Sequence, residues 1–422
     1  MSRQNEDYFR IWMKRKRRPF SAAALHFSHF RVDHALAMIL QQAHLVFPDS
    51  IQSHGDVRIA EGQIVAIAPR LSPAPGEEIL DLAGCFLAPG FIDLHIHGAL
   101  RCDTMDATEE SFATICQHHA KGGTTALSLT TITAPVEAIV AVLKAAKAYR
   151  TKAPLGAQVL GVHIEGPYFS KEKPGAHRPS LIRDPTPAEY AQLLAHADVI
   201  TQMTLAPELP GALELIDALT CAGIRASGGH SDAWDEEASA AHAHGMRQVT
   251  HTFNCMSSAR RSGPYRVAGL LEFAMAEPEI LCELIADGRH VSPTLMRMLC
   301  QAKGPAGIAL ITDATAGAGL AEEERFHLGD IECVVRDGVG LTADGKALAG
   351  STASMIDCVR NMVQLAGVSL PEAVRMATLN PARALGIEAT KGVLQAGADA
   401  DLTAFTPDFK VVSTFSRGHR VV

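Results

Sequence analysis

The pattern of apolar and polar positions along the chain changes twice. From residue 39 to residue 89, short alternating runs such as DVRIAEGQIVAIAP are punctuated by turn residues, which is typical of β-strands. From residue 91 onwards, short apolar runs alternate with helical stretches, the pattern of repeated βα units in a parallel sheet. Residues 391–422 return to a strand-like pattern, so both ends of the chain differ from its centre.

Eight apolar runs in the central region are candidate strands of one parallel sheet. They span residues 91–97, 124–131, 158–165, 202–208, 224–231, 248–254, 281–288 and 307–315. The segments between them carry helix signals, such as Thr186 followed by Pro187 at a start and Gly245 at a stop. Eight parallel strands with intervening helices predict a closed (β/α)8 barrel of the TIM type.

The remaining segments define the expected domain organisation. After the eighth strand, residues 325–350 indicate a hairpin insertion, and two helices follow it. The predicted fold class is α/β: a (β/α)8 barrel over residues 91–388, with a small β-sandwich domain formed from residues 38–90 and 389–422.

The first 37 residues differ from the rest, because they carry a basic run and lack periodicity. For residues 1–37 we expect a disordered extension, or an upstream start codon with Met38 as the physiological start.

Composition narrows the functional classes. The 422 residues are 47% hydrophobic with a net charge of −8, so we expect no nucleic acid and no membrane among the partners. No apolar run approaches the ~18–20 residues that span a bilayer. The nine cysteines form no C-x-x-C pair, and Cys116, Cys221 and Cys282 lie in apolar stretches, which favours reduced core thiols in a reducing compartment. Small molecules and copies of the chain itself are the expected partners.

Ionisable side chains interrupt the apolar strands at their carboxyl ends, the face on which such a barrel carries its site. They are His95 and His97 on the first strand, Glu165 on the third, His230 on the fifth, His251 on the sixth and Asp313 on the eighth. Residues two apart on a strand point to the same side, so His95 and His97 can bind one cation. Burying such groups without partners is costly, and a shared divalent metal supplies the partner. An isolated H-x-H would more often be a pair of surface or core histidines.

Asp313 lies in ITDAT, where a carboxylate at the end of the eighth strand can face the reacting water. We expect it to be the general base that takes a proton from water and passes it to a leaving amine. The alternative is a helix N-cap ahead of Ala314 and Thr315.

With these residues the chain resembles the N-acetylglucosamine-6-phosphate deacetylases of the amidohydrolase superfamily. The likeness runs from about Met38 to the C-terminus through PGFIDLHIHG, GVHIEGPY, GGHSDA, THTFNCMS, LIADGRHV, LITDAT and LAGST. It implies a cytoplasmic hydrolase that removes the acetyl group from N-acetylglucosamine 6-phosphate in amino-sugar catabolism. It also implies a homodimer with one or two divalent ions (Zn, Fe, Mn or Co) per subunit.

The resemblance assigns a role to each matching residue. The primary metal ligands fall on Glu165, His230 and His251, and a second ion, bridged by Glu165, falls on His95 and His97. Asp313 is the catalytic aspartate, His177 polarises the acetyl carbonyl and His290 holds the sugar. The substrate contacts correspond to Ala176, His177, Asn254, Cys255, His290, Leu348, Ala349 and Gly350.

One stretch departs from the family pattern. Where the family carries an arginine that binds the 6-phosphate, this chain has SSARRSGPYRVAG, in which Arg260, Arg261 and Arg266 are candidates. We expect Arg261 to take this role, and a solvated basic loop is the alternative.

Other functions remain open at this point. The substrate can be another acetamido sugar, such as N-acetylgalactosamine 6-phosphate or a non-phosphorylated sugar. A cyclic-amide hydrolase of the same superfamily is disfavoured, because the fourth strand ends TLAPELP and offers no bridging lysine. A catalytically silent sugar-binding barrel is the alternative from another class.

Overall fold

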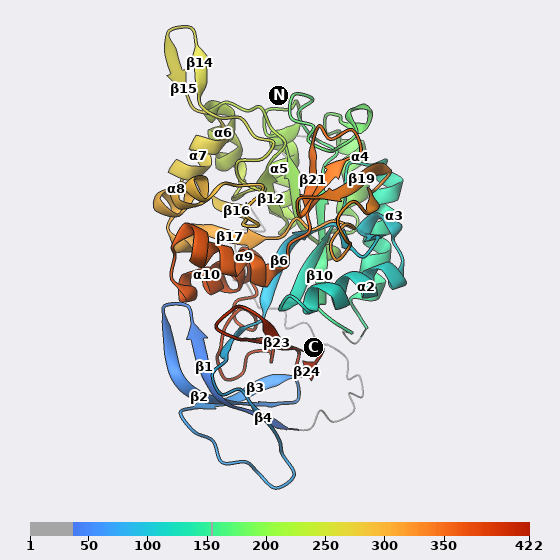
Figure 1. The fold of residues 1–422 in the computed structure, drawn as a ribbon. Helices are drawn as coiled ribbons and strands as arrows, with labels where there is room; N and C mark the ends of the chain where they lie inside the picture. Colours follow the sequence, from blue (N-terminus) through green and yellow to red (C-terminus); the bar gives the residue numbers. More distant parts are fainter. Residues whose placement is uncertain (1–36, 153–154) are drawn as a thin grey trace, which may run out of the picture. The chain divides into compact units, whose positions relative to one another are not determined.

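The computed structural model describes residues 37–152 and 155–422 (Figure 1). The expected disordered extension or upstream start, residues 1–37, therefore lies outside the described residues except for Ala37.

Eight parallel strands form the central sheet, in the order β17-β16-β13-β12-β11-β10-β9-β6. The strands are β6 (Phe91–Ile96), β9 (Thr124–Thr130), β10 (Gln158–Glu165), β11 (Ile200–Leu205), β12 (Arg225–Gly228), β13 (Gln248–Val249), β16 (Leu281–Ile285) and β17 (Ile308–Ile311). The two ends of the sheet meet, because Ile96 bridges Ala314 and the Asp313 amide donates to the His95 carbonyl at 2.9 Å. The prediction of a (β/α)8 barrel is confirmed.

The barrel strands are covered on both faces, which explains their nearly continuous apolar sequences. Every residue of β6, β9 and β16 is buried. The polar residues inside these runs therefore point either into the barrel or toward the surrounding helices, and each one needs a partner there.

Helices connect and surround the strands (Figure 1). They are α2 (Glu109–Ala120), α3 (Val136–Tyr149), α4 (Pro187–Leu194), α5 (Ala212–Cys221), α6 (Asp235–His244), α7 (Leu270–Ala276) and α8 (Pro293–Lys303). Helix α4 begins as the sequence predicts, with Thr186 at the N-cap and Pro187 in the first turn. Helix α6 ends at Gly245, whose φ of 117° is one that side-chain-bearing residues rarely adopt.

The segment after β17 is larger than the single hairpin we expected. Its four strands form an antiparallel sheet in chain order: β18 (Arg325–Leu328), β19 (Ile331–Arg336), β20 (Val339–Thr342) and β21 (Leu348–Ser351). It is followed by α9 (Met355–Asn361), a π-helical turn (Met362–Ala366), α10 (Leu370–Ala377) and α11 (Leu379–Ala384). The turns at Gly329 and Gly338, both with positive φ, allow the chain to reverse between these short strands.

Both chain ends contribute to a second eight-stranded sheet. It runs in the order β24-β23-β22-β5-β1-β2-β3, with β4 paired to β1. Its members are β1 (Met38–Phe47), β2 (Ser50–Ala60), β3 (Gln63–Ala68), β4 (Glu78–Asp81), β5 (Phe86–Pro89), β22 (Leu402–Phe405), β23 (Val411–Ser416) and β24 (His419–Arg420). The join between the chain ends is the antiparallel pair of β5 and β22, in which Leu402 lies opposite Pro89.

All nine cysteines are free. Cys116 and Cys282 are buried as expected, but Cys221 is exposed. Cys221 is the last residue of α5, and the buried face of that helix is formed by other residues, including Leu215 and Leu219. Within residues 37–152 and 155–422, no helix combines the length and apolar character needed to cross a membrane.

Candidate active site

Ionisable residues meet at the carboxyl ends of the barrel strands. His95 lies in β6 and Glu165 is the last residue of β10, whereas His97, His230, His251 and Asp313 follow the ends of their strands. All six residues are buried. The structure therefore brings together side chains that are far apart in the sequence, as the strand-end argument predicts.

Glu165 is the centre of this group, because its two oxygens face different histidines. Its Oε1 lies 3.2 Å from His251 Nε2 and 3.4 Å from His230 Nε2. Its Oε2 lies 3.2 Å from His97 Nε2 and 3.5 Å from His95 Nε2. One carboxylate thus lies between two pairs of imidazoles.

Asp313 completes the half of the group formed by the H-x-H pair. Its Oδ1 lies 3.2 Å from His97 Nε2 and 3.4 Å from His95 Nε2, and the two imidazole nitrogens are 3.2 Å apart. Burial by itself raises the pKa of the Asp313 carboxyl, but the neighbouring charge of His95 and the hydrogen bond with His97 hold that pKa below its usual value. Asp313 is therefore a carboxylate at neutral pH.

The donor atoms fit a divalent cation. Imidazole nitrogens and carboxylate oxygens are the ligands that Zn²⁺, Fe²⁺, Mn²⁺ and Co²⁺ accept, and His95, His97 and Asp313 offer three donor atoms within 4.8 Å of one another. His230 Nδ1 lies 2.9 Å from the Lys173 carbonyl oxygen, which can only accept. The Nδ1 of His230 therefore carries a proton, which leaves Nε2 as the nitrogen that faces the group and can bind a cation.

Three residues of the group have strained backbones. The φ angles are 48° at His230, 32° at His251 and 49° at Asp313, in the left-handed region that favours glycine. Such strain is characteristic of functional sites, where the surrounding fold holds a side chain in a required direction.

His177 differs from the other histidines in its protonation. Its Nδ1 accepts the Thr133 amide hydrogen at 3.2 Å, so the neutral ring carries its proton on Nε2. Burial lowers the pKa of His177 to about 4, which keeps the ring neutral near pH 7. Glu165, His177 and His230 also offer donor atoms within 4.8 Å of one another, but in this tautomer the His177 Nε2, 3.5 Å from Glu165, carries a hydrogen and acts as a donor.

His290 is oriented by an acid on its own loop. Its Nδ1 lies 2.7 Å from Asp287 Oδ2, and Asp287 Oδ1 accepts the His290 amide hydrogen at 2.8 Å. Burial opposes the protonated ring, yet the hydrogen bond and charge of Asp287 raise the pKa of His290 above its ordinary value. The ring is therefore fixed in place, and it lines a cavity.

A cavity of about 370 Å³ opens onto this group. The predicted site residues that line it are His97, Glu165, Ala176, His177, His230, His251, Asn254, Cys255, His290, Asp313, Leu348 and Gly350. His95 does not line it and is fully buried, with its Nε2 in contact with His97 and Asp313. Ala349 is also fully buried, between two residues that line the cavity. The cavity is large enough for a sugar-sized ligand.

The three candidate arginines are not among the lining residues. Arg260 bonds Asp232 at 2.6 Å and stacks over Trp234 at 3.6 Å. Arg261 and Arg266 lie opposite each other on the projecting hairpin of β14 (Arg260–Ser262) and β15 (Tyr265–Val267) (Figure 1). The structure therefore does not bring Arg261 to the cavity of its own chain.

Sequence reasoning missed two residues of the site region. Lys346, in the turn between β20 and β21, lines the cavity. Glu283, in the middle of β16, is fully buried and its Oε2 lies 3.4 Å from His95 Nδ1. A signal for Glu283 exists in the sequence, since a carboxylate inside the apolar run LCELI requires an explanation. The sequence carries no comparable signal for Lys346.

A barrel with imidazoles and carboxylates at this mouth defines the class of metal-dependent hydrolases, and comparison with known proteins agrees. Residues 86–421 match the Amidohydrolase family, and the chain belongs to that family.

Relatives of known name share much of the chain. The chain is 36% identical over 381 residues to the N-acetylgalactosamine-6-phosphate deacetylase of Escherichia coli O157:H7, which covers 90% of this chain and 98% of that protein. It is 38% identical over 353 residues to the N-acetylglucosamine-6-phosphate deacetylase of Mus musculus, and the match covers 82% of this chain and 85% of that protein.

Solved structures agree in fold. The N-acetylglucosamine-6-phosphate deacetylase of Pasteurella multocida superposes with a TM-score of 0.85 at 33% identity, covering 91% of this chain and 99% of that one. The chain also superposes on an aspartate-to-alanine mutant of the Mycobacterium smegmatis N-acetyl-D-glucosamine-6-phosphate deacetylase, whose structure is a complex with N-acetyl-D-glucosamine-6-phosphate. The TM-score is 0.84 at 32% identity, and the match covers 92% of this chain and 100% of that one.

Proposed function

We propose that this protein hydrolyses the acetamide of N-acetylglucosamine 6-phosphate, giving glucosamine 6-phosphate and acetate. The observation that carries the proposal is the convergence of Glu165, His230, His251 and Asp313 at one mouth of the barrel, beside a cavity of about 370 Å³. Membership of the amidohydrolase family and the names of its relatives support the reaction class and the sugar phosphate.

The proposed cofactor is one or two divalent ions, Zn, Fe, Mn or Co. Glu165, His230 and His251 would hold the first ion, and His95 and His97 the second, with Glu165 between them. The placement of the two Glu165 oxygens against different histidine pairs supports this division. Such a cation supplies Lewis acidity, which polarises a carbonyl oxygen and acidifies water.

The side chains of the protein then carry out the proton transfers. Asp313 takes a proton from the attacking water and delivers it to the nitrogen of the leaving amine. The Nε2–H of His177 donates to the acetyl oxygen, and this bond strengthens as negative charge develops there. Because burial lowers the pKa of His177 to about 4, the ring is neutral in the neutral pH range, and its single hydrogen, on Nε2, is available as a donor.

The remaining lining residues of the cavity would contact the sugar. We assign His290 to the sugar hydroxyls, with further contacts from Ala176, Asn254, Cys255, Leu348 and Gly350, and we limit Ala349, which is fully buried, to holding the backbone between the last two. The fixed orientation of His290 by Asp287 supports its use as a specific hydrogen-bonding group.

For the phosphate we propose Lys346, the one lysine or arginine among the residues that line the cavity. Its Nζ lies 3.1 Å from Asp344 Oδ2, and its side chain is 82% exposed. An exposed ion pair of this kind is weak, so the ammonium is free to engage an anion. Arg261 lies outside the cavity of its own chain. We therefore propose it as a phosphate ligand only for the cavity of a neighbouring copy.

We further propose a cytoplasmic homodimer, as the resemblance implies. The nine free cysteines support a reducing compartment. Light scattering of the purified protein tests the dimer directly, and a mass of one chain would contradict it.

The test of function is acetate release from four sugars: N-acetylglucosamine, N-acetylgalactosamine and their 6-phosphates. The proposal expects the highest kcat/KM with N-acetylglucosamine 6-phosphate. A higher value with N-acetylgalactosamine 6-phosphate would favour the second candidate, which the Escherichia coli relative supports. No release from any of the four by the metal-loaded protein would favour a silent sugar-binding barrel.

A further inference from the structure

Glu283 is a buried acid that the proposed reaction does not use. It lies in the middle of β16 with 0% of its surface exposed. Arginine and lysine are absent from its hydrogen-bond partners, which are amide, imidazole and backbone N–H groups of the described residues. A fully buried carboxylate without a cationic partner is unstable unless each oxygen is well bonded.

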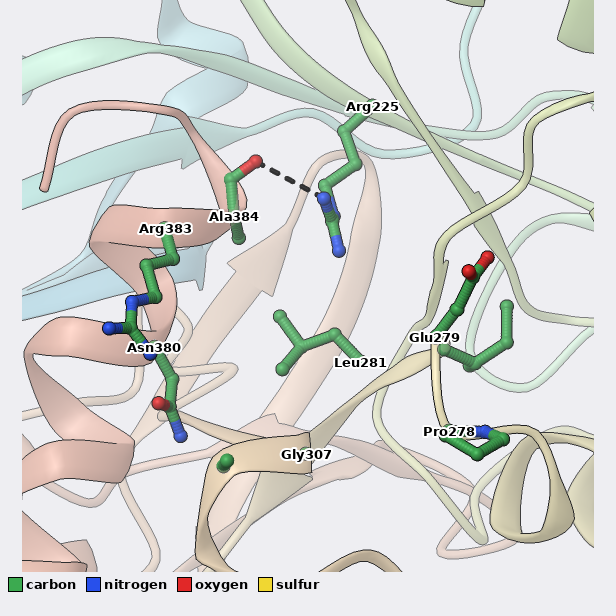
Figure 2. A pocket seen from close by; sticks show the side chains of 10 residues that line it. Arg225, Pro278, Glu279, Leu281, Gly307, Asn380, Arg383 and Ala384 are labelled. Carbon is green, nitrogen blue, oxygen red and sulfur yellow. Dashed lines mark hydrogen bonds between the residues drawn. The ribbon is translucent and has the colours of Figure 1, made fainter.

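The orientation of the amides around Glu283 is fixed from the opposite mouth of the barrel. Arg225, at the start of β12, lines a second cavity of about 180 Å³ and bonds the Ala384 carbonyl oxygen there (Figure 2). Its Nε lies 2.7 Å from Gln248 Oε1. A guanidinium can only donate, so the Gln248 oxygen faces Arg225 and its NH₂ group faces the barrel interior.

The amide hydrogens then converge on one oxygen of Glu283. Gln248 Nε2 donates to Glu283 Oε1 at 2.6 Å and to Gln202 Oε1 at 2.9 Å. With its own oxygen occupied, Gln202 turns its NH₂ group to Glu283 Oε1, at 2.8 Å. Two N–H donors thus occupy Oε1, an arrangement that suits a carboxylate acceptor.

The other oxygen of Glu283 faces the H-x-H strand. Its Oε2 lies 3.4 Å from His95 Nδ1 and 3.4 Å from the backbone nitrogen of His251. Because an ionised carboxylate can only accept, His95 Nδ1 must carry the proton. The Nε2 of His95 is then left with a lone pair, 3.2 Å from His97 Nε2 and 3.4 Å from Asp313.

We propose that Glu283 is a positioning residue that holds His95 in the Nδ1–H tautomer, so that His95 Nε2 can bind the cation. The inference rests on the proposed metal centre. It adds to that centre an acid that is not one of the metal ligands predicted from the sequence. Partners of this kind fix the ring orientation and increase the basicity of a ligating imidazole.

The test is the Glu283→Gln variant of the full chain. Glutamine keeps the volume but can place an NH₂ group against His95 Nδ1, which reverses the tautomer and puts a proton on Nε2. We expect Zn²⁺ affinity, measured by competition with a chromogenic chelator, to fall about 10- to 100-fold. The number of ions bound per chain, measured on the same sample by elemental analysis, should fall as well. Wild-type affinity and stoichiometry in this variant would overturn the inference.

A matched control separates positioning from a loss of stability. Asp401, which directly precedes β22, is another buried acid, 4% exposed, and it is paired with Lys391. Asp401→Asn also neutralises a buried carboxylate but does not touch the His95 region, so its Zn²⁺ affinity should equal that of the wild type. If both variants lose affinity equally, the effect is structural and the inference fails.

A second variant covers the case in which Glu283→Gln does not fold. Glu283→Asp keeps a carboxylate but withdraws it from His95, and we expect a loss of affinity smaller than the roughly 10- to 100-fold expected for Glu283→Gln. Unchanged Zn²⁺ affinity in Glu283→Asp would show that the contact with His95 is not needed. Failure of the proposed metal centre is distinguishable, because the wild-type protein itself would then take up no Zn²⁺.

Discussion

A methyl group added at Gly350 should displace Asp313 without changing any group that reacts. Gly350 lies in β21 with φ of +66°, and a Cβ there would lie 2.5 Å from the Asp313 carbonyl oxygen and 2.5 Å from Thr315 Cγ2. Contacts under 3.0 Å force a shift, and the Asp313 backbone is held on the other side by its bond to the His95 carbonyl. Because Gly350 also lines the cavity and is an assigned sugar contact, Gly350→Ala tests the placement of Asp313 through kcat, whereas a lost sugar contact would appear in KM.

The magnitude follows from two contributions. A left-handed backbone costs a side-chain-bearing residue about 1–2 kcal/mol, and overpacking adds about 1–3 kcal/mol. We expect the free energy of unfolding to fall by about 2–5 kcal/mol in total. A misplacement of roughly 1 Å in a catalytic group lowers kcat by about 10²-fold.

Gly338→Ala is the matched control. Gly338 has φ of +73°, but nothing lies within 4 Å of its missing Cβ. This variant should lose about 1–2 kcal/mol of stability from the backbone alone and keep the wild-type kcat. Urea unfolding and acetate release measured on both variants separate the two effects. If Gly350→Ala loses stability as expected but keeps the wild-type kcat, the position we assign to the Asp313 carboxylate is wrong.

Further predictions concern single side chains. Asp313→Asn should lower kcat by about 10²- to 10⁴-fold with ions still bound, and a near-normal rate at full metal content would refute its role. His177→Gln should lower kcat about 10²-fold or more with little change in KM, which steady-state kinetics can check. Lys346→Ala should raise KM for the 6-phosphate several-fold and leave kcat/KM for N-acetylglucosamine unchanged; equal effects on both sugars would exclude a phosphate contact. Burial lowers the pKa of His119 to about 3, below its unfolded value near 6.5. The native state therefore binds fewer protons than the unfolded state, and the free energy of unfolding should fall as pH drops from 6.5 toward 3, by about 3 kcal/mol at pH 4. In pH-dependent urea unfolding, His119→Gln should reduce this loss.

Much of the fold could be predicted because the barrel strands are recognisable in the sequence. Buried parallel strands read as apolar runs, and eight of them separated by helical stretches allow few other architectures. The same pattern made the acids and histidines of the site recognisable, because a polar residue such as Glu165 or His230 at the end of an apolar run requires a buried partner.

The missed residues show the limits of that reasoning. Glu283 lies in the middle of its strand, so an argument confined to strand ends passes over it, although its burial needs the same explanation. The contribution of Lys346 depends on how the four-stranded insertion places its β20–β21 turn beside the cavity, a tertiary arrangement without a local sequence signal. Arg261 has the right chemistry for a phosphate, but its direction is set by the projection of the β14–β15 hairpin.

The most direct test combines metal content and turnover on a single sample. Purified protein is assayed for acetate release from N-acetylglucosamine 6-phosphate as isolated, after removal of ions with a chelator, and after Zn²⁺ or Fe²⁺ is restored. We expect one or two ions per chain, loss of release when they are removed, and recovery when they return. Undiminished acetate release by the ion-free protein would contradict the account.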